Sequence, residues 1–177
     1  MIAIRTLILF LIAPLLLWAS AAQAAVTITF YSHDFGSRFP HAFVVLQGTV
    51  DETGEVVNTN YGFTAVNVSP GILFGSVKGK IETSKAKYIA KSDPHFSMVL
   101  SDMQYRAVIA KMVEWRDRPQ KSYNLNKRNC VHFVGEVATL LGLQINPKTK
   151  YWKKPKSFLR EVRKLNPGVQ VAPGAPD

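Results

Sequence analysis

Three apolar segments follow one another closely and predict an antiparallel arrangement of strands. Residues 26–32 alternate between apolar and polar types, residues 41–47 are almost continuously apolar, and residues 55–61 return after a turn at 51–54. A further strand is predicted at 95–100. Helical patterns then follow at 103–116, 130–141 and 157–165. This order predicts an α+β fold, with an antiparallel sheet of about five strands packed against helices.

The first 24 residues have the pattern of a secretory signal peptide. Arg5 precedes an apolar run at 7–18, and Ala22-Gln23-Ala24 supplies the small residues that signal peptidase requires. An uncleaved membrane anchor is the alternative, but the run is shorter than the roughly 20 residues that span a bilayer. We therefore expect a periplasmic or secreted protein after cleavage.

The rest of the chain divides into a main domain at 25–145, which holds the candidate functional residues described below, a basic extension at 146–165 and a Pro/Gly-rich tail at 166–177 that we expect to be disordered. The whole chain has 22 basic and 12 acidic residues, a formal net charge of +10. The extension carries most of this excess. It is either a solvated face or a surface that binds an anionic envelope through Lys153, Lys154 and Lys156. No nucleic-acid-binding motif is present.

The sequence offers no sign of a cofactor or a metal. A single cysteine excludes an internal disulfide and a cysteine-cluster metal site, and the four histidines do not form a short ligand motif. That cysteine, Cys130, follows Asn129 at a predicted helix start. Backbone N–H groups there lower the pKa of a thiol and can hold an oxyanion. A buried small hydrophobe is the structural alternative.

The segment from Tyr123-Asn124 to Asn129-Cys130-Val131-His132-Phe133 resembles the nucleophile helix of the circularly permuted papain-like hydrolases. That group includes permuted NlpC-type cell-wall peptidases and lecithin:retinol acyltransferase-like proteins. The resemblance covers roughly residues 26–143. It implies Cys130 as nucleophile and His41, which begins an apolar strand, as its base. We therefore expect the Cys130 sulfur within about 4 Å of a His41 ring nitrogen.

The third polar residue of such a site orients the histidine from the neighbouring strand. In the family it is often another histidine, which this chain lacks there. Asn58 and Asn60 lie on the predicted returning strand and point to one face. Asn58 fits the family spacing better, and Asn60 remains the alternative. For the other histidines we expect no catalytic role: His33 lies in the loop before residue 41, with a position in a cleft as its alternative, His132 packs or hydrogen-bonds to the sheet, and His95 lies on the surface.

Three functions are compatible with these residues. The first is a secreted cysteine hydrolase, of the thiol protease kind, that cleaves amide bonds in cell-wall (peptidoglycan) peptides through Cys130, His41 and Asn58. The second is a lipid-acyl thioesterase, phospholipase or acyltransferase with the same residues, in which the apolar segment at 71–75 faces a membrane. The third is a non-catalytic envelope-binding protein.

Overall fold

The computed structural model describes residues 25–34, 39–67, 70–119 and 122–176. The predicted signal peptide lies outside these residues. None of the helices in the described ranges is long and apolar enough to cross a bilayer.

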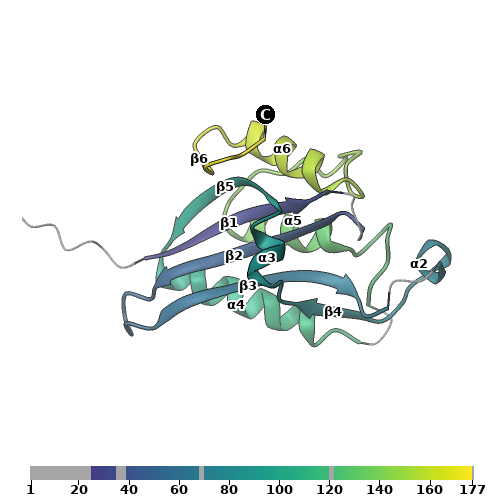
Figure 1. Ribbon diagram of the computed structural model, residues 1–177, viewed down its shortest axis with the longest axis horizontal. Coiled ribbons are helices and arrows are strands. Elements are labelled where there is room, and N and C mark those ends of the chain that lie inside the picture. The colour runs from purple at the N-terminus through teal and green to yellow at the C-terminus, as the bar shows by residue number, and fades with distance from the viewer. Residues whose placement is uncertain (1–24, 35–38, 68–69, 120–121, 177) are drawn as a thin grey trace, which may run out of the picture.

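The fold is α+β, as predicted, and is built on one antiparallel sheet (Figure 1). The sheet has six strands in the order β4-β3-β2-β1-β5-β6, where about five were expected. The strands that the sequence predicted are β1 (Val26–His33), β2 (His41–Thr49), β3 (Val56–Ala65) and β5 (Asp93–Leu100). The sequence did not predict the two short edge strands β4 (Gly79–Glu82) and β6 (Gln170–Val171).

The two central helices are α4 (Asp102–Arg116) and α5 (Cys130–Leu140), and α6 (Pro155–Leu165) follows them. Helix α5 packs on β2 and β3, and α6 packs on β1 and β5. Two single-turn helices, α2 (Gly71–Phe74) and α3 (Ala86–Ile89), lie in the loops around β4. Helix α3 crosses the face of the sheet opposite α4 and α5 (Figure 1).

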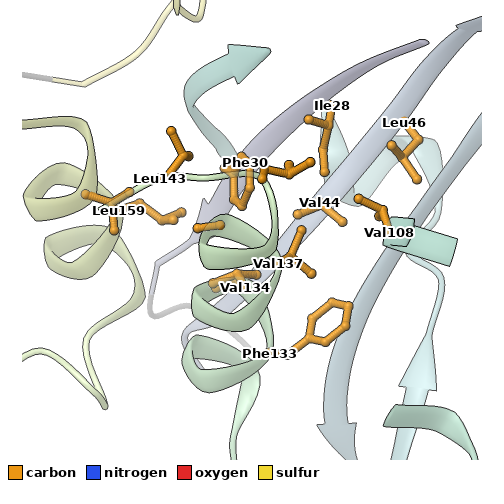
Figure 2. Close-up of a cluster of buried hydrophobic side chains, with 14 of the residues drawn as sticks. Ile28, Phe30, Val44, Leu46, Val108, Phe133, Val134, Val137, Leu143 and Leu159 are labelled. Atoms are coloured by element: carbon orange, nitrogen blue, oxygen red, sulfur yellow. The ribbon is translucent and has the colours of Figure 1, made fainter. Parts of the chain in front are cut away.

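Alternation along the strands builds the core between the sheet and α5. Ile28, Phe30, Val44 and Leu46 point from β1 and β2 toward the helix, as Figure 2 shows. Helix α5 contributes Phe133, Val134 and Val137 to this core, and each of them is at most 1% exposed. Full burial of such side chains stabilises the fold by about 1.5–3 kcal/mol each. The core therefore fixes where α5 begins relative to β2.

The C-terminal region differs from the expectation of an extension and a disordered tail. Helix α6 buries Phe158, Leu159 and Val162 in the main core, and β6 pairs with β5 at Phe96↔Val171. The sequence prediction followed the high charge and the Pro/Gly content of this region. The apolar stripe along α6 instead determines where this helix packs. Lys153 and Lys154 are exposed, whereas Lys156 forms ion pairs with Asp34 at 2.9 Å and Asp93 at 2.7 Å.

The expectation of a surface position for His95 is wrong. Its side chain is completely buried and its Nε2 lies 2.8 Å from the Ser32 hydroxyl. Strand β6 and helix α6, which sequence placed outside the domain, flank this part of β5. Burial lowers the pKa of His95 to about 4, and nearby Arg163, Arg160 and Lys156 also lower it, although Asp93 opposes them.

Candidate active site

A buried polar cap fixes the start of α5. The Asn129 side-chain oxygen accepts the N–H groups of Val131 at 2.8 Å and His132 at 3.3 Å. Its amide nitrogen donates to the carbonyls of Leu125 and Trp152, both at 2.8 Å. One side chain thus ties the helix to two other segments. Cys130, the first helical residue, is held in place by this cap.

The thiol of Cys130 is buried against the beginning of β2. The residue is only 6% exposed. Backbone N–H groups of Ala42, Val131 and Cys130 itself point to the sulfur and favour the thiolate, but burial outweighs them and raises the pKa of Cys130 to about 11. The expected lowering of the pKa is therefore wrong for this structure. At neutral pH the group is a protonated thiol.

The sheet opens beside this thiol. Strand β2 pairs with β1 as far as His33↔His41, but its pairing with β3 ends at Val44↔Tyr61. The first three residues of β2 are therefore paired on one side only. Ala42 lies within this unpaired stretch, and its N–H points to the Cys130 sulfur and favours the thiolate.

His41 lies on the other side of the same opening. Its ring stacks on Phe43, with centroids 5.9 Å apart, and its Nε2 occupies the space that a side chain at Gly62 would fill. Part of the residue stays accessible, but burial lowers the pKa of His41 to about 4. The charge of Glu82 raises this pKa, and His33 lowers it further. The imidazole is neutral at pH 7, and its Nδ1 is the ring nitrogen that does not face Gly62.

The start of β2 lies against Cys130, but the side chains of Cys130 and His41 do not form a hydrogen bond. Among the described residues, no hydrogen bond links the Cys130 sulfur to a His41 ring nitrogen. Ala42 belongs to the core on the α5 side, whereas His41 and Phe43 alternate to the opposite face. The two groups therefore approach the opening between β2 and β3 from opposite sides of the sheet.

The assignment of Asn58 or Asn60 as the third residue needs correction. Asn58 is exposed, lies opposite Gln47 and accepts a hydrogen bond from it at 3.4 Å. It is six residues along β2 from His41, or about 20 Å at the rise of a strand. Asn60 is buried and uses its amide to bind both backbone groups of Ser84, at 2.6 and 3.1 Å. Both side chains are structural.

Glu82 is the acidic side chain that acts on His41, and sequence reasoning missed it. Gly62, whose missing side chain makes room for the imidazole, pairs directly with Glu82 of β4. Residues opposite each other in an antiparallel pair share a face of the sheet. The carboxylate also forms an ion pair with Lys80 at 2.9 Å. The sequence could have indicated Glu82 only through strand β4, which it did not predict.

The remaining histidines have packing roles. His33 stacks on Tyr88 at 4.2 Å and lies 3.0 Å from the Ser92 hydroxyl. His132 stacks on Trp152 at 4.5 Å and completes the cap with Asn129, as its predicted packing role requires. The described residues contain no group of three or more metal-ligating side chains.

Comparisons with protein-family models, with curated proteins and with solved structures find no match for this chain. The α+β class is therefore established by the structure alone. The resemblance to permuted papain-like hydrolases stays a hypothesis that depends on the residues around Cys130 and His41.

Proposed function

We propose that this protein is a cysteine hydrolase that cleaves amide bonds, with peptidoglycan peptides as the expected substrate. Cys130 is the nucleophile, His41 is the base and acid, and Glu82 replaces Asn58 as the polar group beside the histidine. The observation that carries the proposal is the contact between the Cys130 sulfur and the N–H of Ala42, the residue that follows His41. Cys130 thus lies against the residue next to His41, although the two residues are far apart in sequence.

The protonation states suit a general-base mechanism. A neutral imidazole can accept the thiol proton on Nδ1 while the sulfur attacks the carbonyl carbon. The carbonyl electron pair moves to oxygen, and the N–H of Cys130, which the Asn129 side chain does not bind, stabilises that charge. His41 then returns the proton to the departing amine as the C–N bond breaks. Water, deprotonated by His41, attacks the thioester and releases the acid and the thiol.

The chemistry requires His41 to reach the thiol through the opening between β2 and β3. The pairing of β2 with β3 ends at Val44↔Tyr61, so no ladder hydrogen bonds hold residues 41–43 to β3. The packing also explains why the resting thiol stays protonated, because the charged pair of thiolate and imidazolium is costly away from water.

Digestion of purified sacculi tests the proposal. The mature protein should release peptides with new amino and carboxyl termini, detected by mass spectrometry. Cys130→Ser should reduce release by about 10³-fold or more, because the hydroxyl has a far higher pKa than the thiol. The variant's thermal unfolding is measured beside it. Equal release by a folded Cys130→Ser protein contradicts the proposal.

A lipid-acyl substrate is the second candidate, since the same dyad can cleave an ester or thioester. The exposure of Leu73 at 65% and Phe74 at 88% favours it, because both lie in the loop next to the segment that leads into Cys130. Release of fatty acid from phospholipid vesicles by the wild-type protein, and not by Cys130→Ser, separates this candidate from the first.

A further inference from the structure

The chain from Pro70 to Gly75, here termed the apolar tip, projects from the body of the protein. It contains α2, which has no buried residue. Figure 1 shows α2 standing beyond the sheet, at the end where β3 finishes and β2 begins. Leu73 and Phe74 are 65% and 88% exposed. Adjacent large apolar side chains with exposed fractions this high are typical of an interaction site.

The base of the apolar tip is fixed to the segment that leads into Cys130. The N–H of Val66 donates to the carbonyl of Lys78 at 2.8 Å, which closes the loop. Val77 and Tyr123 exchange two backbone hydrogen bonds of 2.9 and 3.0 Å. The Asn124 amide donates to the Ser76 hydroxyl at 3.0 Å. The tip is therefore presented in a set position near the candidate active site.

The surroundings of the tip are basic. Residues 70–81 and 122–134 contain Lys78, Lys80, Lys127 and Arg128 and no acidic residue. Lys80 pairs with Glu82, and the Arg128 guanidinium donates to the Ser122 carbonyl. Lys78 and Lys127 are exposed and form no ion pair with any described residue. An apolar tip flanked by cations is complementary to a surface with negative head groups over an apolar interior.

We propose that the apolar tip docks the protein on anionic phospholipid bilayers, with Leu73 and Phe74 inserted among the acyl chains and Lys78 and Lys127 against the head groups. This interaction goes beyond the proposed function, because it holds whether or not Cys130 is catalytic. It turns the end of the sheet that carries His41 and Cys130 toward the membrane. An enzyme docked in this way acts on substrates at the bilayer surface.

Vesicle sedimentation of the mature chain tests the proposal. Wild-type protein should bind vesicles that contain phosphatidylglycerol more tightly than vesicles of phosphatidylcholine alone. Leu73→Ala/Phe74→Ala should weaken binding to the anionic vesicles by about tenfold or more, since both side chains supply the inserted surface. Lys78→Gln/Lys127→Gln should weaken it by about tenfold at low salt, and the difference should shrink as salt rises.

The matched control is Val99→Ala/Met103→Ala at the opposite end of the sheet. These side chains are similarly exposed, at 62% and 72%, and should leave binding unchanged. Absence of wild-type binding overturns the proposal. So does equal binding by the Leu73/Phe74 variant, or an equal loss in the control. Because every variant retains Cys130 and His41, hydrolysis of a soluble peptide is measured separately and decides only the proposed function.

Discussion

The two long helices begin at opposite ends of the sheet, and at each end backbone N–H groups of the chain point to the side chain of the first helical residue. Asp102 begins α4 and accepts the N–H groups of Asp51 at 3.1 Å and Glu52 at 2.7 Å, in the turn between β2 and β3. Cys130 begins α5, and the N–H of Ala42 at the start of β2 points to its sulfur. A carboxylate is a strong acceptor, whereas a thiol is a weak one.

This difference separates a structural end from a chemical end. At the Asp102 end, β2 and β3 are paired up to Thr49↔Val56, next to the turn. At the Cys130 end, β2 lacks its β3 partner over three residues and a thiol occupies the opening. A thiol contributes little to holding a strand. Under the proposed function, the chemistry of the thiol accounts for its presence at this end.

Substitutions of Asp102 and Cys130, the first residues of α4 and α5, should affect the free energy of unfolding very differently. Asp102→Ala removes a charged acceptor from two N–H groups and from a helix start, so we expect a loss of about 3 kcal/mol in the free energy of unfolding. Cys130→Ser keeps the size and improves the acceptor, so we expect a change within about 1 kcal/mol. Urea denaturation of both variants measures this, and an equal loss in the two would remove the distinction between the ends.

A decrease in pH should destabilise the folded protein through the buried imidazole of His95. The pKa of His95 is lowered to about 4 by burial, so between pH 6.5 and pH 4 the unfolded chain binds a proton that the folded chain does not. Stability is complete above pH 6.5 and falls as the pH decreases toward 4. We expect His95 to account for a loss of about 2 kcal/mol between pH 7.5 and 4.5.

Denaturation of His95→Gln at both pH values isolates this contribution, since glutamine retains a polar partner for Ser32 and does not titrate. The variant should lose less stability than the wild type on acidification. An unchanged pH dependence would show that His95 does not carry the effect.

Gly62→Ala should disturb the His41 side of the opening. A Cβ at this position clashes with His41 Nε2 and comes within 3.1 Å of the Phe43 Cβ. We expect the imidazole to move, a loss of about 1 kcal/mol in stability and a clear loss of hydrolysis. Gly75→Ala is the control, since nothing lies within 4 Å of a Cβ there. Full activity in Gly62→Ala would mean that the observed ring position is irrelevant to function.

The smallest expected effect concerns Glu82. Its charge raises the pKa of His41, so Glu82→Gln should lower that pKa further. We expect a shift of less than about one unit, because the carboxylate is partly exposed and paired with Lys80. Titration of the His41 ring by NMR measures the shift, with Glu55→Gln at the far turn as control. An unchanged pKa in Glu82→Gln would exclude Glu82 as the partner of His41.

The sequence predicted the long strands and helices because each has its own periodic pattern. Asn129 also marked the start of α5 correctly. What it could not predict depends on contacts between distant segments. Strand β4 is only four residues long, and its pairing with Gly62 decides that Glu82 acts on His41. The sign of the Cys130 pKa shift depends on burial by β2, which a helix-start argument does not include.

The most direct test of a Cys130–His41 dyad is covalent acylation of the resting protein. The mature chain is mixed with an activated acyl ester, and intact-mass spectrometry with peptide mapping follows a single acyl group on Cys130. The account predicts rapid acylation in the wild type, none at this position in Cys130→Ser, and a rate about 100-fold lower in His41→Gln, because general-base assistance contributes roughly this much. Acylation of His41→Gln at the wild-type rate, or no acylation of Cys130 in the wild type, would contradict it.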